Sequence, residues 1–214
     1  ENNSLDEAMD KFNQVIALSP DYELAFFNRA VIRVKKNEQV SALTDYNKVV
    51  ELNPNNDAAL INRALLKQSM NNMEGAIKDY ENAIKANANN AIAYYNKATL
   101  LIDKKEYVTA LSDLSKAVAL NPNNDMAFYT KGTIHFRNNE YKEALESFDK
   151  AIALQKTPKE FMLNDRGSTK LKLNDFSGAI EDYTKATKAN NKQAYIFNNL
   201  GSAYKKRGEQ NIEQ

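Results

Sequence analysis

The sequence is poor in residues that interrupt or cross-link a chain. Its 214 residues include no cysteine, six glycines, four prolines and one histidine. The absence of cysteine excludes disulfides and thiolate metal sites, and it is compatible with a cytoplasmic or an exported location. Glycine and proline are the strongest helix breakers, while alanine, leucine, lysine, glutamate and asparagine are plentiful. We therefore expect an almost wholly α-helical protein.

Neither an excess of one charge nor a long apolar run is present. The 29 basic and 28 acidic residues leave a net charge of +1, which gives no long-range field to attract nucleic acid or an anionic membrane. No apolar run approaches the roughly 20 residues that a membrane-spanning helix needs. We therefore expect no nucleic-acid partner and no membrane insertion in this segment. The chain starts at Glu1 without a charged and apolar leader, and we expect a mature or excised piece.

A unit of 34 residues recurs along the chain. The hexapeptides ELNPNN at 51–56 and ALNPNN at 119–124 lie 68 residues, or two units, apart. Small residues return at the same spacing, with one step of 35, at two places in the unit. The first place holds Ala30, Ala64, Ala98, Gly132, Gly167 and Gly201, and the second holds Ala42, Ala76, Ala110 and Ala144. Such a period is typical of helical repeat arrays, in which each unit must stack on its neighbours.

Each unit has the apolar pattern of two helices. In the unit 91–124, one apolar stripe with helical spacing covers 94–101 and a second covers 107–118. The polar segment 103–106 between them predicts a turn. Asn-Pro-Asn-Asn then ends the second helix, because proline cannot continue a helix and asparagine tolerates left-handed geometry.

This pattern resembles the tetratricopeptide repeat, a 34-residue unit with small residues at positions eight and twenty, an aromatic residue at twenty-four and proline near the end. Position eight holds the first set of small residues named above. Position twenty-four holds Phe12, Tyr46, Tyr80, Leu114, Phe148 and Tyr183. The resemblance covers essentially the whole chain. It implies an all-α fold, a right-handed α-solenoid or superhelix of stacked helix-turn-helix units.

We expect a single domain, 1–214, with five full repeats and a partial repeat at each end. The full repeats are 23–56, 57–90, 91–124, 125–159 and 160–193. Residues 1–22 are expected to supply the second helix of a truncated repeat. Residues 194–214 are expected to start a further repeat, with a first helix over 194–208. Both ends would leave an apolar stripe uncovered, which motivates stacking on another copy or on a flanking domain.

Two features depart from the family pattern. Position eleven, usually tyrosine in the family, is variable here, and we expect looser packing around it. It holds Arg33, Lys67, Leu101, His135 and Lys170. One extra residue within 155–160 is expected to change the stacking angle between the fourth and fifth repeats.

Position seven carries a base where the family usually has leucine. The residue sixteen places later, at position twenty-three, is an acid in four of the five units. The bases are Arg29, Arg63, Lys97, Lys131 and Arg166, and their counterparts are Asp45, Asp79, Asp113, Ser147 and Asp182. We expect a partly exposed ion pair between the two helices of a repeat, worth about 0–1 kcal/mol. A charged track for a ligand is the alternative.

Residues suited to catalysis are scarce. The one histidine, His135, lies at the variable position eleven, where packing is its usual role. The sequence has no glycine-rich phosphate loop, no histidine pair at metal-ligand spacing and no Ser-His-Asp order. We predict that this segment is not an enzyme and holds no metal and no cofactor.

In a stacked solenoid the first helices line the concave face, with a stripe of positions two, five, six, nine and thirteen. Positions five and six are expected to contact the ligand. The candidate peptide-binding residues at these positions are Asn28, Asn62, Asn96, Asn199, Phe27, Ile61, Tyr95 and Tyr129. An amide both donates and accepts, so a row of asparagines can pair with the backbone of an extended peptide whatever its sequence. The resemblance implies this role, because family members with long grooves use asparagines here. The alternative is that these side chains only pack between helices.

The expected function is therefore that of a protein–protein interaction module or scaffold, with another protein or peptide as the partner. The ligand would be an extended segment or a partner helix in the concave groove. The lysines and arginines with which one group of the family clamps a C-terminal carboxylate are absent. A structural self-assembly element, stacking through open ends, and an accessory domain of a larger multidomain protein are the alternatives.

Overall fold

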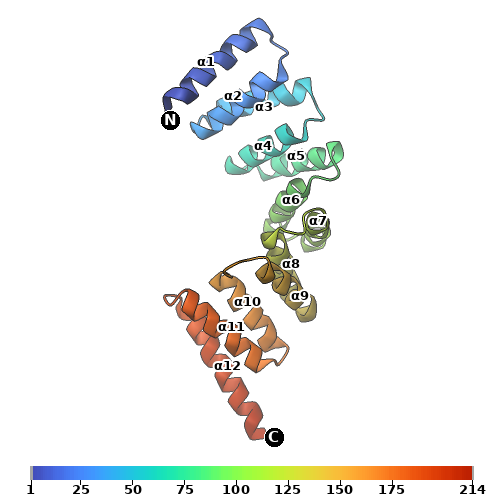
Figure 1. Cartoon of the computed structure of the whole chain (residues 1–214). Helices are drawn as coiled ribbons and strands as arrows, with labels where there is room; N and C mark the ends of the chain where they lie inside the picture. Colours follow the sequence, from blue (N-terminus) through green and yellow to red (C-terminus); the bar gives the residue numbers. More distant parts are fainter. Residues whose placement is uncertain (1, 214) are drawn as a thin grey trace. The chain divides into compact units, whose positions relative to one another are not determined.

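The computed structural model describes residues 2–213, and within that range it contains twelve α-helices and no strand (Figure 1). Their bounds are α1 Asn2–Leu18, α2 Glu23–Lys35, α3 Gln39–Leu52, α4 Asp57–Ser69, α5 Met73–Ala86, α6 Ala91–Asp103, α7 Tyr107–Leu120, α8 Asp125–Arg137, α9 Tyr141–Ala153, α10 Glu160–Lys172, α11 Phe176–Ala189 and α12 Ala194–Glu213. The prediction of an all-α helical repeat is confirmed. The chain divides into two compact units, Glu1–Glu106 and Tyr107–Gln214, and the expectation of one domain over 1–214 stays a prediction.

The first unit contains α1 to α6, and each helix packs on the next one in the chain. Its core forms around the small residues at positions eight and twenty, which let the paired helices approach closely. Ala30, Ala42, Ala64 and Ala76 are fully buried. The rings of Tyr46 and Tyr80 are buried beside them, since a small residue on the facing helix leaves room for a large one.

The second unit contains α7 to α12, with α8 paired to α9 and α10 paired to α11. Its fourth and fifth repeats have glycine at position eight. A Cβ atom on Gly132 would lie 2.7 Å from the ring of Phe148, and one on Gly167 would lie 3.0 Å from the ring of Tyr183. In these two repeats the aromatic residue at position twenty-four therefore occupies the space of the missing side chain.

The turn inside each repeat contains one residue in the left-handed region. Asn37, Asn71, Lys105, Asn139 and Asn174 have φ between 61° and 63°. In the first of these turns, the Asn37 amide donates to the carbonyl of Val34, and the Glu38 amide donates to that of Arg33 at 2.8 Å. This pattern ends a helix by satisfying its last carbonyls. Asparagine suits the position because its short polar side chain tolerates positive φ.

The repeated Asn-Pro-Asn-Asn segment forms the linker between repeats, and its asparagines hold the linker in place. Asn53 Nδ2 donates to Glu23, the first residue of the same repeat, and Asn53 Oδ1 accepts from the Asn55 amide. Asn56 Nδ2 also donates to Glu23, while Asn56 Oδ1 accepts from the Ala59 amide and caps α4. The linker thus ties the start of one repeat to the start of the next.

The same arrangement recurs one repeat later at Asp57. Asn90 Nδ2 and Asn87 Nδ2 each donate to Asp57 Oδ2 at 2.8 Å. The hydrogen bond from Asn90 and then the one from Asn87 lower the pKa of the Asp57 carboxyl, because they stabilise its ionised form.

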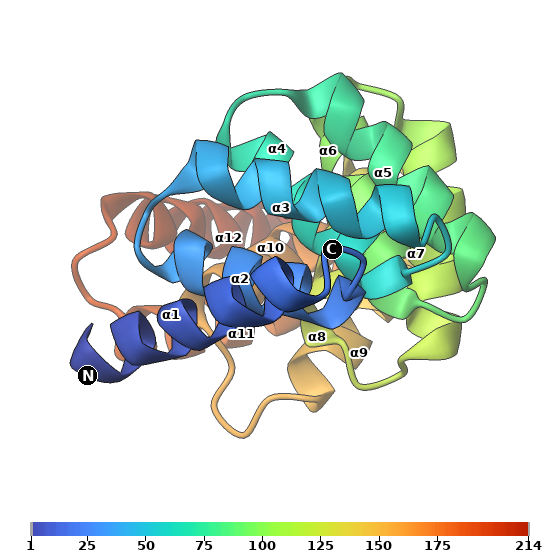
Figure 2. The same cartoon turned by 90° about the horizontal axis from the view of Figure 1, so that it is seen from above.

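The linker between the fourth and fifth repeats is longer. It covers residues 154–159, whereas the linker between α3 and α4 covers 53–56 (Figure 2, orange loop). Gln155 takes the place of the linker asparagine, since its Nε2 donates to Asp125 Oδ2 at 2.6 Å and its Oε1 accepts from the Lys159 amide. The insertion is confirmed, and its effect on the stacking angle stays a prediction.

The last helix differs from the expected one. A first helix over 194–208 followed by a turn was expected, but α12 continues to Glu213. Gly208 stands where the other repeats have their left-handed residue, yet it does not have positive φ. Glu209 and Gln210 are good helix formers, and no second helix packs back on α12 within the described residues, so the chain there stays helical.

Candidate binding face of the first helices

The expected ion pair between the two helices of a repeat is present in the first, second and fifth repeats. Arg29 and Asp45 lie 2.7 Å apart, as do Arg63 and Asp79, and Arg166 and Asp182 lie 2.5 Å apart. In each pair the arginine Nε also donates to the other carboxylate oxygen, so the contact is bidentate. The aspartates are more buried than expected, with side chains only 1–2% exposed.

Position eleven does not mark looser packing in these repeats, which corrects the prediction. Its cation contacts the same buried aspartate as the arginine at position seven. Arg33 lies 2.7 Å from Asp45, and Lys170 lies 2.8 Å from Asp182. Lys67 is placed likewise, at 2.7 Å from Asp79. Each buried carboxylate therefore has two cations, one from each of two successive turns of the first helix.

The sequence carries a signal for this second cation that treating each position separately missed. In the fourth repeat the acid is replaced by Ser147, and position eleven is His135 instead of lysine or arginine. Ser147 Oγ donates to the carbonyl of Glu143, and His135 Nδ1 contacts Glu140 Oε2 at 2.6 Å. Acid and second base are thus lost together in this repeat.

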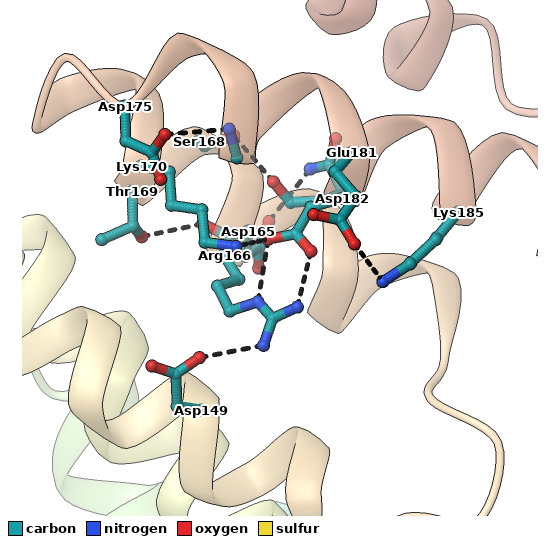
Figure 3. A network of polar contacts seen from close by, with 12 residues as sticks. Asp149, Asp165, Arg166, Ser168, Thr169, Lys170, Asp175, Glu181, Asp182 and Lys185 are labelled. Atoms are coloured by element: carbon teal, nitrogen blue, oxygen red, sulfur yellow. Dashed lines mark hydrogen bonds and ion pairs between the residues drawn. The ribbon is translucent and has the colours of Figure 1, made fainter.

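The arginine at position seven also reaches the preceding repeat. Arg29 Nη1 donates to Asn13 at 2.7 Å, Arg63 Nη1 to Asn47 at 3.0 Å and Arg166 Nη1 to Asp149 at 2.9 Å. Figure 3 shows Arg166 between the carboxylates of Asp182 and Asp149. One side chain therefore links the two helices of its own repeat to the second helix before it. These charges hold repeats together, which supports the structural reading over a charged ligand track.

No cluster of three or more histidine, cysteine, aspartate or glutamate side chains suited to a metal ion occurs in the part of the chain that the structure describes. None of the described helices is both long enough and apolar enough to cross a membrane.

The candidate asparagines occupy the first helices of both units. Asn28, Asn62 and Asn96 lie half-buried on α2, α4 and α6 of the first unit. Asn96 interacts with the hydroxyl of Tyr80 in the preceding repeat: burial raises the pKa of Tyr80 to about 12, and the Asn96 bond lowers it in part. Asn199, on α12 of the second unit, donates from Nδ2 to Asn164 Oδ1 at 2.9 Å. Asn96 and Asn199 therefore already bridge neighbouring repeats.

The candidate residues at position five are mostly engaged in packing. Ile61 is 7% exposed and belongs to the core, which leaves little of it for a ligand. Phe27 packs edge-on against Tyr46 with the ring centroids 6.0 Å apart. Tyr95 is half-buried. Tyr129 packs edge-on against a neighbouring ring and donates its hydroxyl to Asp165 at 2.6 Å.

A pocket of about 280 Å³ opens between the first helices of the first unit's two complete repeats, α2 and α4. Asn62 lines it together with the exposed side chains of Val34 and Leu65, and the ring of Tyr46 lies at its base. The remaining lining residues are Gln39, Leu66 and Ser69. Of the eight candidate residues, Asn62 is the one that lines this pocket.

A second pocket, of about 220 Å³, occupies the equivalent place between α8 and α10 in the second unit. Its lining residues are Thr133, Phe136, Phe148, Asp165 and Ser168. Positions twelve and twenty-four of one repeat and six and nine of the next line both pockets. We call the surface formed by positions five, six, nine and twelve of the first helices the first-helix face. The sequence predicted positions six and nine as part of this face, although it named no candidate residue at position nine. It missed position twelve, for which the exposed apolar Val34 is the available signal.

Two family models match the sequence. A model described as "TPR repeat" matches residues 167–208, and one described as "Anaphase-promoting complex, cyclosome, subunit 3" matches residues 69–151. A comparison with curated proteins finds no match.

Solved structures with the same fold cover most of the chain. The crystal structure of YrrB, described as "a TPR protein with an unusual peptide-binding site", has a TM-score of 0.77 at 22% identity and covers 87% of this chain and 96% of its own. MamA from Desulfovibrio magneticus RS-1 has a TM-score of 0.70 at 20% identity and covers 80% and 96%. The pilF protein of Pseudomonas aeruginosa has a TM-score of 0.70 at 18% identity and covers 96% and 88%.

The fold is thus an all-α helical repeat, built from helix hairpins of 34 residues whose helices pack in chain order within each unit. The match of residues 167–208 to the tetratricopeptide repeat model and the repeat fold together support a tetratricopeptide repeat protein. The repeat fold and the proteins similar to it support a protein–protein interaction scaffold with protein or peptide partners.

Proposed function

We propose that the first-helix face binds an extended segment of a partner protein. The observation that carries this proposal is the recurrence of a pocket at equivalent repeat positions, once in each unit. A pocket that returns with the repeat suits a ligand that runs across successive first helices and places side chains at intervals. The chain itself acts as a non-catalytic binding module, without a cofactor.

The chemistry of the first unit's pocket suits a peptide better than a small polar ligand. The Asn62 amide offers two donors and an acceptor, which can pair with a peptide backbone. Val34 and Leu65, 43% and 44% exposed beside it, offer apolar area for a side chain. Asn28 precedes Asn62 by one repeat at the same position and supplies a second amide for the same segment. That the structurally similar YrrB is described as having a peptide-binding site adds support.

The test is a selection of peptides from a random displayed library on the full chain, followed by affinity measurement with variants. Asn62→Ala with Tyr95→Ala is expected to weaken selected peptides at least about tenfold, because it removes an amide and a ring from the first-helix face. The helical circular dichroism spectrum should stay unchanged.

The matched control takes an amide and an apolar side chain from elsewhere in the same unit. Asn55→Ala lies in a linker and Val40→Ala on a second helix, and both residues are exposed. This control should bind as the parent does. Equal loss in both double variants, or none in the first, would move the binding surface away from the first-helix face.

A second candidate function is self-association through α12. Phe197 and Tyr204 are each 48% exposed and stand seven residues, or two turns, apart on one side of this helix. Light scattering over a range of concentrations tests this candidate. A mass that rises with concentration in the parent and not in Phe197→Ser with Tyr204→Ser supports it, and a constant monomer mass rejects it.

A further inference from the structure

The pocket of the second unit contains a carboxylate that no ion pair neutralises within the described residues. Asp165 lies half-buried in the pocket wall. Its Oδ2 accepts from the Tyr129 hydroxyl at 2.6 Å and its Oδ1 from Asn164 Nδ2 at 3.1 Å. A carboxylate has about four acceptor sites, so roughly half of them stay available.

A second carboxylate, Asp182 of α11, contacts α10 and is neutralised by cations of that helix. Asp182 faces α10 and has two cations at 2.5 and 2.8 Å, Arg166 and Lys170. Arg166 is further engaged with Asp149. The cations nearest to Asp165 in the sequence are therefore bound elsewhere. Lys172 follows it by seven residues, which is about 10 Å along a helix, and is exposed.

The rest of the lining offers acceptors and aromatic rings. Thr133 Oγ1 donates to the carbonyl of Thr130 at 2.7 Å, and Ser168 Oγ donates to that of Asn164 at 3.0 Å. Their hydroxyl hydrogens are thus used inside the helix, and the Thr133 oxygen can accept. Ser168 Oγ also lies 3.0 Å from the Tyr183 hydroxyl, so its oxygen is already partly engaged. Phe136 and Phe148 complete the wall. A negative charge, hydroxyl oxygens and aromatic faces together suit a cation on an apolar stem.

We propose that this pocket receives a lysine or arginine side chain of the bound segment. The inference rests on the proposed function and adds the chemistry of one ligand position. The stem of the basic side chain lies along Phe136 and Phe148, and its head donates to Asp165. The equivalent pocket of the first unit has the neutral Asn62 at this position, so charge distinguishes the two pockets.

The first experiment uses the library selection on two forms of the full chain, the parent and Asp165→Asn. This substitution keeps the shape of the side chain and its contact with Tyr129 while it removes the charge. Peptides selected on the parent are expected to be enriched in lysine or arginine at one position. Replacing that residue by glutamine should weaken binding about tenfold on the parent and less than about twofold on Asp165→Asn, the size expected for one charge-assisted contact.

The outcomes separate this inference from the proposed function. Selected peptides that depend on Asn62 and show no basic position would overturn the inference and leave the proposed function in place. An equal loss on the parent and on Asp165→Asn would also overturn it, because the basic residue would then bind elsewhere. The absence of any peptide that depends on the first-helix face would overturn both.

A second measurement needs no selected peptide. Amide spectra of the full chain are recorded with N-acetyl-arginine amide, N-acetyl-lysine amide and, as the neutral isostere of arginine, N-acetyl-citrulline amide. Shifts at Asp165, Ser168 and Phe148 are expected with the two cations, and not with citrulline or in Asp165→Asn. Equal shifts with arginine and citrulline would contradict recognition of charge. A response to only one cation would decide between lysine and arginine.

Discussion

At the scale of the residue, the most consequential side chains are the buried aspartates at position twenty-three. Asp45, Asp79 and Asp182 each receive a bidentate arginine from position seven and a second cation from position eleven. Removing a charge from water is costly, and breaking a buried pair by deleting one partner is more damaging than losing an exposed pair. These buried ion pairs therefore contribute to the stability of the fold. The balanced charge of the sequence alone would suggest only surface charges.

Asp182→Ala should lower the free energy of unfolding by about 3 kcal/mol, because it leaves Arg166 and Lys170 without their shared partner. Denaturation by urea measures this loss. Lys185→Ala is the matched control, since its contact with Glu181 lies exposed on the surface, and it should change the midpoint little. Similar midpoints for the two variants would show that the buried network contributes no more than a surface pair.

Buried tyrosines at position twenty-four predict a late alkaline titration. Burial raises the pKa of Tyr46 and of Tyr80 to about 12, from an ordinary value of 10.0. Below pH 10 the folded and the unfolded chain both carry the proton, so the free energy of unfolding does not change with pH through these two groups. Between about pH 10 and 12 the unfolded chain releases the proton first, and the free energy of unfolding falls.

Absorbance of tyrosinate should therefore show a phase with a midpoint near pH 12 whose amplitude falls in Tyr46→Phe with Tyr80→Phe. Tyr22→Phe, which removes an exposed hydroxyl, should leave this phase intact. If the double variant instead loses amplitude near pH 10, the two hydroxyls are hydrated in the folded state.

At the scale of the residue, the sequence predicted contacts whose two members recur together in the repeats. The arginine–aspartate pair was predicted because both members recur at a fixed spacing. The second cation was missed because position eleven was compared with the tyrosine usual in the family, and not with the acid at position twenty-three of the same chain. Whether Asn62 is free for a ligand and Asn199 is bonded to Asn164 depends on distances between repeats, which spacing does not give.

At the scale of the element, helix hairpins depend on how closely their two helices approach. Position eight is alanine in the first three repeats and glycine in the next two, where a Cβ atom would meet the ring at position twenty-four. The periodicity of the sequence predicted the helices and their order well. It could not predict that α12 would continue through Gly208, since in other repeats the turn at this position is stabilised by a second helix that packs back.

Two glycine-to-alanine substitutions at the same repeat position should have opposite effects. Gly132→Ala places a methyl group 2.7 Å from Phe148 and should destabilise the protein by about 1–3 kcal/mol, as overpacking does. Gly201→Ala meets nothing within 4 Å and should stabilise α12 by up to about 1 kcal/mol, since alanine favours a helix. Thermal unfolding compares the two variants. The same sign for both would mean that position eight acts through helix propensity alone.

At the scale of the whole molecule, the repeat unit determines both the fold and the surface that the chain presents. The family and the all-α fold were accessible from the 34-residue period, because each repeat must bury its apolar stripes on the next one. The pockets were not accessible from this period, since each one is formed by side chains of two consecutive repeats, within residues 34–69 in the first unit and 133–168 in the second. Their lining differs most in charge, with Asn62 in one unit and Asp165 in the other.

The central claim is that first helices, and not second helices, contact the partner segment. Amide spectra of the full chain with and without a selected peptide test it directly. The largest shifts should fall on Leu65 and Asn62 for a peptide bound to the first unit, and on Asp165 and Ser168 for a peptide bound to the second. Shifts concentrated on the second helices α3, α5, α9 and α11, with the pocket residues unchanged, would contradict it.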